Sequence, residues 1–344
     1  MNRSTLAIFL GEWLPKIEFE IRDVLGNSEA EVANHYGMMH YHMGWVDENL
    51  RPVQLLAGKR LRPIFLILAC AEVGGDPLRA IPAAAAVELL HNFSLIHDDI
   101  EDGDEARRHR PTVWKVWGVP QAINAGDGMF TLAFSAMQRM RQRDVSNSTV
   151  LKALDTFTQS CLELTEGQHL DMSFERRDEV TVKEYMRMIQ GKTASLVGAC
   201  VSIGARVGNA SDEVCESLQR FGRAVGMSFQ IRDDILGIWG DPAVTGKPAG
   251  NDVLRRKKSF PMLYTLNHPG LGEQFEALLG DNFTADKLPN ALEILEKSGA
   301  RQEAERAAEA WHQASIAALQ QALGKDATDS ALWALAESLL TRQS

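Results

Sequence analysis

Apolar residues recur at three- and four-residue spacing along most of the chain, and the alternation typical of strands is scarce. The spacing is clearest in segments 149–161, 182–189 and 218–238, and it is the pattern of an amphipathic helix. Residues 301–340 are rich in Ala, Leu, Glu and Gln, which are strong helix formers. The pattern therefore predicts an all-α protein with roughly ten or more helices.

Proline placement agrees with this prediction, because proline interrupts helices and is rare inside them. No proline lies between Pro120 and Pro242, and none follows Pro289. Pro82 stands where a first helical turn tolerates proline, and nothing in residues 83–102 would stop a helix. Residues 240–259 instead combine glycine and proline with lysine and arginine, which predicts a mobile basic loop.

Composition and charge exclude several classes of protein. The 344 residues are 45% hydrophobic and 24% charged, as in ordinary globular proteins. The formal net charge is −10 and no long basic stripe is present, so nucleic acid is not an expected partner. No apolar run approaches the ~18 residues that cross a bilayer. The cysteines lack CxxC spacing, and no linker divides the chain. We expect a single cytoplasmic domain, residues 1–344, with reduced cysteines.

The sharpest chemical feature is the segment His97-Asp98-Asp99-Ile100-Glu101-Asp102, at the end of the helix predicted from residue 83. Asp98 and Asp102 are four residues apart and therefore share a helical face. Two carboxylates on one face suit a magnesium ion that is shared with substrate phosphates. Taken alone, such a segment is also compatible with a solvated acidic helix end.

A second acidic pair, Asp233-Asp234, follows the apolar segment 221–231 and precedes further apolar residues. Carboxylates in so apolar a helix would cost several kcal/mol if they were buried without partners. The pair is therefore expected to have cations nearby.

Short basic motifs supply those cations. Gly58-Lys59-Arg60-Leu61-Arg62-Pro63 opens an apolar helix, and Arg107-Arg108 follows the first acidic motif. Helix N-termini and arginine side chains favour anions, so both segments are candidate diphosphate sites. Lys192-Thr193 and Lys257 are further candidates. A P-loop is excluded, because Met186 stands where that motif requires glycine.

Together, these motifs resemble the trans-isoprenyl diphosphate synthases of the polyprenyl synthetase family. The matching segments, in the family's order, are Gly58 to Pro63; Glu88-Leu89-Leu90-His91; Ser94 to Asp99; Arg107-Arg108; Gly126-Asp127; Gly167-Gln168; Lys192-Thr193; Phe229 to Asp234; and Gly246-Lys247-Pro248 with Asp252 and Lys257. The resemblance implies an all-α isoprenoid synthase fold around a central cavity, usually in a homodimer. It also implies head-to-tail condensation of isopentenyl diphosphate with dimethylallyl, geranyl or farnesyl diphosphate through an allylic carbocation.

The resemblance further implies roles for individual residues. Asp98, Asp102 and Asp233 would bind magnesium, with about three ions per active site bridged by the allylic diphosphate. The isopentenyl diphosphate site would comprise Lys59, Arg62, His91 and Arg108. The groups that neutralise the allylic diphosphate would be Arg107, Lys192, Lys247 and Lys257, and those near the carbocation would be Thr193 and Gln230. Because water would quench the cation, the loop 240–259 is expected to close as a lid.

The helix before the first acidic motif bears on product length. Phe93 lies five residues before Asp98, and Ser94 lies on nearly the same face as Asp98. In the resembled family, large side chains at these two positions form the floor for the growing chain. Phe93 with the small Ser94 resembles geranylgeranyl diphosphate synthases, so a twenty-carbon product is expected, with fifteen-carbon farnesyl diphosphate as the alternative. Phe93 packed against a neighbouring helix, with the floor built elsewhere, is the competing interpretation.

Some residues depart from the family's pattern. Gly237 stands where many relatives carry the third aspartate of the second acidic motif, although Asp233 remains. His109-Arg110 stands where relatives often have Gly-Lys. The histidines at positions 35, 40 and 42 fit no compact set of metal ligands, so an interhelical segment is expected there.

Two other functions compete with this one. A class I terpene cyclase is disfavoured, because the residues after Asn251-Asp252 lack the serine and glutamate of its second motif. A cyclase would also have no second diphosphate for Arg62 and Arg108. A non-catalytic subunit of a heteromeric prenyl synthase gains some support from Gly237, but such subunits typically lose the first acidic motif, which is intact here.

Overall fold

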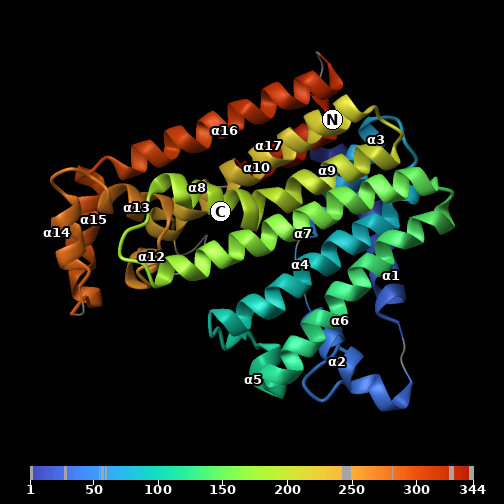
Figure 1. The fold of residues 1–344 in the computed structure, drawn as a ribbon, viewed down its shortest axis with the longest axis horizontal. Helices are drawn as coiled ribbons and strands as arrows, with labels where there is room; N and C mark the ends of the chain where they lie inside the picture. Colours follow the sequence, from blue (N-terminus) through green and yellow to red (C-terminus); the bar gives the residue numbers. More distant parts are fainter. Residues whose placement is uncertain are drawn as a thin grey trace. The chain divides into compact units, whose positions relative to one another are not determined.

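The computed structural model describes residues 3–26, 29–53, 55, 58, 60–241, 249–280, 282–324 and 329–340, with side chains from residue 8 onward. The described chain is almost wholly helical, as the hydrophobic pattern predicts (Figure 1). Two predicted substrate-binding residues, Lys59 and Lys247, lie outside the described residues. So do residues 242–248 of the predicted basic loop.

The helices, in chain order, are α1 (Arg3–Leu25), α2 (Ala33–His42), α3 (Leu61–Glu72), α4 (Ile81–Glu101), α5 (Val113–Trp117), α6 (Val119–Gln138), α7 (Asn147–Glu175), α8 (Val182–Ile189), α9 (Ser195–Val207), α10 (Asp212–Trp239), α12 (Asn251–Leu254), α13 (Phe260–Leu266), α14 (Gly272–Leu278), α15 (Leu288–Lys297), α16 (Ala300–Leu323) and α17 (Ala331–Leu340). A two-stranded hairpin, β1 (Ala106–Arg107) and β2 (Arg110–Pro111), follows α4. A π-helical segment, Gln190–Ala194, joins α8 to α9.

Contacts divide the chain into two compact units. Unit 1 comprises Met1–Thr158 and Cys200–Cys215, and unit 2 comprises Gln159–Ala199 and Glu216–Ser344. Helices α7, α9 and α10 each contribute residues to both units. Candidate site residues occur in both.

Unit 1 is organised around the pairing of α4 with α6, which lie side by side (Figure 1). The first half of α4 includes the small buried residues Ala83 to Ala86, and α6 buries Ala122, Ala125 and Gly126. Small side chains let two helices approach closely. A Cβ at Gly126 would overlap the ring of His97 on α4, so this glycine sets the spacing beside the first acidic motif.

The predicted course of α4 is confirmed. Pro82 lies in its first turn and Asp102 is its C-cap residue, so the helix covers the predicted span. Proline is not a helix breaker everywhere in this chain, however, because α1 continues through Pro15. The four cysteines are buried and unpaired with one another, as predicted.

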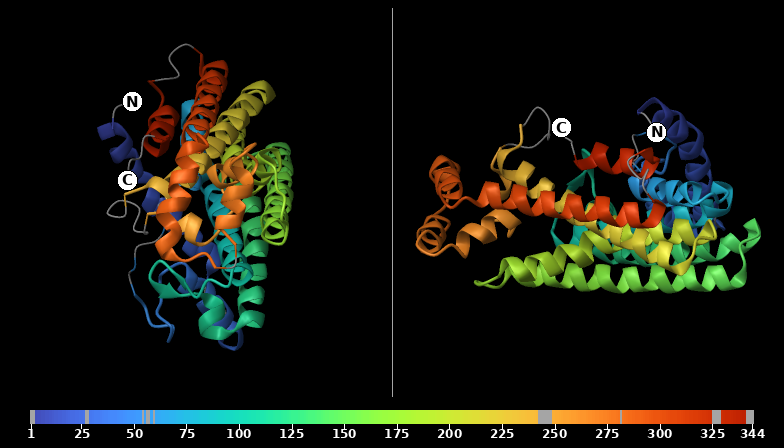
Figure 2. Two further views of the ribbon diagram at one scale, coloured as in Figure 1. Left: turned by 90° about the vertical axis from the view of Figure 1, so that its left-hand side faces the viewer. Right: turned by 90° about the horizontal axis from the view of Figure 1, so that it is seen from above.

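Unit 2 packs α8, α10, α13 and α16 around an apolar cluster that includes Tyr185, Ile231 and Phe260. A capping box begins α8: the Thr181 hydroxyl accepts from the Glu184 backbone N–H, and the Glu184 carboxylate accepts from the Thr181 N–H. Helices α14 and α15 gather at one end of α16 (Figure 2), where a second apolar cluster holds α15 against α13.

Two further observations concern predictions made from the sequence. Of the predicted basic loop, residues 251–254 form the single helical turn α12. Over the part of the chain that the structure describes, no helix is long and apolar enough to cross a membrane.

The contact between α9 and α3 yields a prediction about stability. A Cβ at Gly204 would overlap the backbone carbonyl of Leu66 and lie 3.0 Å from the Cβ of Ala69. Gly204→Ala should therefore lower the free energy of unfolding by about 1–3 kcal/mol through overpacking. Gly11→Ala is the matched control, because Gly11 is helical with nothing within 4 Å of its Cβ position. It should be neutral or stabilising. Chemical denaturation of both variants checks this, and an unchanged Gly204→Ala would contradict it.

Candidate active site

The first acidic motif places two carboxylates in the last turn of α4. Asp98 is half-buried and Asp102 is exposed, and the Asp102 backbone N–H donates to the Asp98 carbonyl at 2.9 Å. The C-terminal end of a helix carries partial negative charge. The backbone therefore adds to the negative charge of these two carboxylates and favours a cation beside them.

Arg107 on β1 supplies one positive charge beside these carboxylates. Its Nε donates to Asp99 Oδ1 at 2.6 Å, and its Nη2 lies 3.5 Å from Asp98 Oδ2. Asp99 is buried, with 1% exposure, and burial raises the pKa of Asp99 to about 6 even though Arg107 opposes the shift. The middle aspartate of the motif is therefore a packing partner of Arg107, whereas Asp98 and Asp102 are more accessible.

The hairpin that carries Arg107 turns through two residues in the left-handed region. Arg108 has φ 52° and His109 has φ 62°, the geometry of a type I′ turn, which glycine and asparagine prefer. Residues with a Cβ adopt it at a cost of about 1–3 kcal/mol each. This explains why glycine in place of His109 suits relatives. Arg110 anchors the hairpin by donating to the carbonyls of Tyr41, at 3.2 Å, and Val46, at 2.8 Å.

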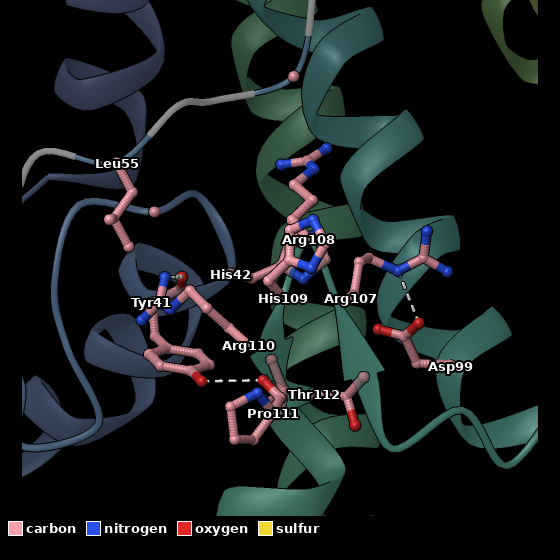
Figure 3. A pocket seen from close by; sticks show the side chains of 13 residues that line it. Tyr41, His42, Leu55, Asp99, Arg107, Arg108, His109, Arg110, Pro111 and Thr112 are labelled. Carbon is pink, nitrogen blue, oxygen red and sulfur yellow. Dashed lines mark hydrogen bonds and ion pairs between the residues drawn. The ribbon is translucent and has the colours of Figure 1, made fainter. Parts of the chain in front are cut away.

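A cavity of about 710 Å³ lies in unit 1 beside this hairpin (Figure 3). Its lining comprises Tyr41, His42, Gly44, Leu55, Gly58, Asp99 and Arg107 to Val113. A Cβ at Gly58 would lie 2.9 Å from Arg108 Nη2. The lack of a side chain at this glycine of the first basic motif therefore leaves room for the Arg108 guanidinium. The cavity combines cations with apolar walls, which suits an anionic ligand with a hydrocarbon part.

Arg62 and His91 belong to the same neighbourhood. Burial lowers the pKa of His91 well below its ordinary value, and the charges of Arg62, Arg108 and His42 lower it further. Burial likewise lowers the pKa of His42 to about 3, with Arg108 and Arg107 adding to the effect. Both imidazoles are therefore neutral hydrogen-bonding groups among arginines, so they can contact an anion without adding charge.

Arg60, the middle cation of the first basic motif, has a structural role. It is buried and donates to Glu88 at 2.6 Å and to Glu18 at 3.1 Å. It also adopts a left-handed conformation, with φ 50°, as the N-cap of α3. Asn92 donates to the same Glu88 oxygen at 2.9 Å. This network fixes the backbone just before Arg62, the residue that the sequence assigns to substrate.

In unit 2, the predicted residues Lys192 and Thr193 lie on the π-helical segment. Such segments are frequent at functional sites, and here glycine makes room for one: a Cβ at Gly167 on α7 would overlap the Lys192 backbone and lie 2.8 Å from the carbonyl carbon of Gly191. Lys192 Nζ donates to Asp171 at 2.6 Å. Thr193 Oγ1 donates to Gln230 Oε1 at 3.0 Å, so the two groups predicted to lie near a carbocation contact one another.

The second acidic motif separates into one exposed and one buried carboxylate. Asp233 is exposed on α10. Asp234 is fully buried and accepts from the Tyr185 hydroxyl, from the Phe260 backbone N–H at 3.0 Å and from Gln230 at 3.4 Å. Burial raises the pKa of Asp234, although Lys257, the Tyr185 hydroxyl and the Phe260 N–H oppose the shift. Asp233 is thus the accessible member of the pair.

Lys257 lies beside two carboxylates. Its Nζ is 3.6 Å from Asp234 Oδ1 and 3.7 Å from Asp252 Oδ2, and half of the side chain is exposed. Desolvation lowers the pKa of Lys257, but the charges of Asp234, Asp252 and Asp171 outweigh it, so the net shift is upward. Lys257 is therefore a permanent cation at neutral pH.

The sequence assigned no role to four residues that the structure brings to these groups. They are His42, Asp171, Tyr185 and Asp252. Asp171 and Tyr185 contact their partners from other helices, 21 and 49 residues away in the chain, so local spacing did not reveal them. Asp252 lies only five residues before Lys257, in a segment that the sequence had already matched to the family.

The carboxylates of the first acidic motif fit one kind of metal site. Among the described residues, no group of three or more His, Cys, Asp or Glu side chains is arranged to hold a metal ion. Magnesium, however, is usually bound by one or two carboxylates together with water and substrate phosphates. Asp98 and Asp102, one turn apart, supply such a pair. They fit an ion shared with a phosphate and not one held by protein side chains alone.

Comparison with known proteins identifies the family. The model of the family described as polyprenyl synthetase matches residues 44–295, which include every predicted site residue. The chain belongs to the polyprenyl synthetase family.

Relatives within the polyprenyl synthetase family match most of the chain. A (2E,6E)-farnesyl diphosphate synthase of Mycobacterium tuberculosis is 42% identical over 77% of this chain and 74% of that protein. A geranylgeranyl diphosphate synthase of the same organism is 42% identical over 83% of this chain and 81% of that protein. The crystal structure of geranylgeranyl pyrophosphate synthetase from Pyrococcus horikoshii superposes with a TM-score of 0.86, at 33% identity, covering 98% of this chain and 99% of that one.

The divided second motif of this polyprenyl synthetase leads to a prediction. Asp234→Ala should lower the free energy of unfolding by about 2–5 kcal/mol, because the Tyr185 hydroxyl and the Phe260 N–H would lose their buried acceptor. Asp233→Ala should change it by less than about 0.5 kcal/mol, because Asp233 is exposed. Urea denaturation of the two variants compares them, and equal losses would show that the burial of Asp234 does not support the fold.

Proposed function

We propose that the protein joins isopentenyl diphosphate head-to-tail to an allylic diphosphate, releasing inorganic diphosphate. The observation that carries this proposal is the presence of two kinds of anion site. Arg62 and Arg108 surround the neutral His91 with positive charge in unit 1, whereas Lys192 and Lys257 in unit 2 are each paired with carboxylates. A reaction between two diphosphates requires two such sites, and a cyclase requires one.

Asp98, Asp102 and Asp233 are the proposed ligands of magnesium, with about three ions in the complete site. When bound, magnesium supplies positive charge that stabilises the departing diphosphate. Magnesium binding should depend on the substrate, because two carboxylates leave most coordination positions of the ion to phosphate and water.

The protein's own residues account for the remaining steps. Arg62 and Arg108 hold the diphosphate of isopentenyl diphosphate, and neutral His91 donates a hydrogen bond to it. Lys192 and Lys257 stabilise charge on the allylic diphosphate as its carbon–oxygen bond breaks. The isopentenyl double bond then attacks the allylic cation, forming one carbon–carbon bond. The proton lost from the adjacent carbon passes to the released diphosphate. The side-chain oxygens of Thr193 and Gln230 face the positive charge of the allylic cation.

The proposed product is geranylgeranyl diphosphate, with farnesyl diphosphate as the alternative. The ring of Phe93 packs against Phe130 of α6, with centroids 4.8 Å apart, and the row continues through Phe134 to Phe157. Packing against a neighbouring helix and acting as a floor are therefore compatible, because Phe93 remains half-buried in this row. Ser94 donates to the His91 carbonyl at 2.8 Å and adds little bulk.

The remaining features of the proposal follow the family resemblance. Residues 1–344 act as one catalytic domain, the basic loop 240–259 excludes water, and the enzyme is a cytoplasmic homodimer. The alternative, a non-catalytic subunit, is disfavoured by the intact pair Asp98 and Asp102.

The decisive experiment incubates the purified protein with labelled isopentenyl diphosphate, each allylic primer and magnesium, and sizes the products by chromatography. Chelation with EDTA should stop turnover, and Asp98→Asn should reduce it by orders of magnitude. Asp155→Asn, which alters an exposed carboxylate of α7, is the matched control and should retain activity. Product formation in excess EDTA would refute the metal-assisted mechanism, and no product with any primer would refute the proposed function.

A kinetic prediction separates the two diphosphate sites. Arg62→Ala should mainly raise the KM for isopentenyl diphosphate, by about tenfold or more, because it removes a charged donor. Lys192→Ala should mainly raise the KM for the allylic substrate. Steady-state kinetics with each substrate varied in turn tests the assignment, and the reverse pattern would show that the sites are exchanged.

A second prediction concerns product length. Phe93→Ala should shift products beyond twenty carbons, because it removes a ring from the aromatic row near the first acidic motif. Leu151→Ala, which truncates an exposed apolar side chain of α7, is the control and should leave the distribution unchanged. A fully active Phe93→Ala with unaltered product length would exclude Phe93 as the determinant.

A further inference from the structure

The last residue of α2, His42, lies just before the region that the family model matches, which begins at residue 44. Its side chain is one of those that line the cavity of unit 1 (Figure 3). His42 is also among the groups that depress the pKa of His91, so the two rings are neighbours. Two imidazoles, one from α2 and one from α4, therefore approach the same part of unit 1.

The backbone after α2 fixes the place of His42. The Gly44 N–H donates to the Tyr41 carbonyl at 2.9 Å, and the Trp45 N–H donates to the His40 carbonyl at 3.0 Å. Gly44 itself has a φ of 82°. Two such hydrogen bonds around a left-handed glycine form a Schellman motif, which ends a helix at a defined residue. The position of His42 is therefore set by the backbone and does not depend on a ligand.

The Nε2 atom of His42 is buried, and it forms no hydrogen bond with any of the described residues. A buried polar atom without a partner is costly, and native proteins rarely keep one without a use for it. The Nε atom of Arg62, which also lies near His91, is in the same condition. Both atoms could be satisfied by one acceptor that binds in this neighbourhood.

The charges around His42 determine which acceptor this is. Burial, together with the positive charges of Arg108 and Arg107, lowers the pKa of His42 to about 3, and the Asn92 side chain opposes the shift. The imidazole is therefore neutral at pH 7, and one of its two nitrogens carries a proton that it can donate. The guanidinium groups beside it carry only donors. An anion attracted by these arginines is thus the acceptor that suits an Nε2–H donor.

We propose that His42 is a further substrate-binding residue, whose Nε2–H donates a hydrogen bond to the diphosphate of isopentenyl diphosphate. The inference rests on the proposed function, which assigns that diphosphate to Arg62, His91 and Arg108. His42 adds a donor to this group without adding positive charge to a site where arginines already repel one another. It also makes α2 a part of the substrate site.

Replacing His42 by methionine and by glutamine separates the hydrogen bond from the packing of the side chain. The two replacements have nearly the same length and shape, but only glutamine carries a donor near the position of the imidazole Nε2. His42→Met should raise the KM for isopentenyl diphosphate by about tenfold, through loss of one hydrogen bond to a charged group. The KM for the allylic diphosphate should stay within about twofold. His42→Gln should recover most of the loss.

His35→Met is the matched control, because His35 lies on the same helix but contacts Asn124 of α6 and does not line the cavity. Both KM values should stay unchanged in this variant. Should thermal melting show that His42→Met does not fold, His42→Asn takes its place, since its amide reaches only the position of Nδ1. An unchanged KM for isopentenyl diphosphate, an equal rise in both KM values, or a His42→Gln no better than the variant without the donor would overturn the proposal.

A binding measurement keeps the result independent of turnover. Calorimetry uses isopentenyl diphosphate alone, without magnesium or an allylic diphosphate, so that no reaction occurs. The wild type and His42→Gln should bind it with similar Kd, and His42→Met should bind it about tenfold more weakly. A wild-type protein that shows this order but forms no product with any primer would refute the proposed function while supporting the role of His42. Equal Kd values for the three proteins would refute that role.

Discussion

Charge that enters a helical core must be compensated there, because a lone ion loses its hydration and gains nothing in return. Three cations of the candidate site are compensated in this way. Arg107 contacts Asp99, Lys192 contacts Asp171, and Lys257 lies between Asp234 and Asp252. Each pair fixes the direction of a long side chain before any substrate arrives. A diphosphate then meets oriented cations, so little side-chain entropy remains to be lost on binding.

The sequence was sufficient where the signal was local. Periodicity and the position of Pro82 predicted α4, and the four-residue spacing of Asp98 and Asp102 predicted their common face. The separation of Asp233 from Asp234 also follows from helical geometry, since adjacent residues point about 100° apart. Which of the two would be buried could not be predicted, because the donors to Asp234 come from α8 and α13, far away in the chain.

Backbone irregularities were beyond sequence reasoning for a different reason. The π-helical segment at Lys192 depends on Gly167 and Gly191 of two helices meeting at close range. The left-handed turn at Arg108 and His109 contains no glycine from which it could be predicted. It is stabilised by the hydrogen bonds of Arg110 to the carbonyls of Tyr41 and Val46. In both places a tertiary contact overrides local preference. An unusual residue in a motif is therefore best interpreted together with whatever occupies the space around it.

The network around Arg60 has a consequence for where the folding unit begins. Family similarity starts at residue 44, yet Glu18 of α1 accepts from Arg60 at 3.1 Å and from the Trp45 indole at 2.6 Å. The bounds of the family model thus differ from those of the folding unit. A chain trimmed to the matched region would leave Arg60 with Glu88 as its remaining carboxylate and would uncover the Trp45 indole N–H. The first helix, although outside the region that the family model matches, supports the segment that carries the first basic motif.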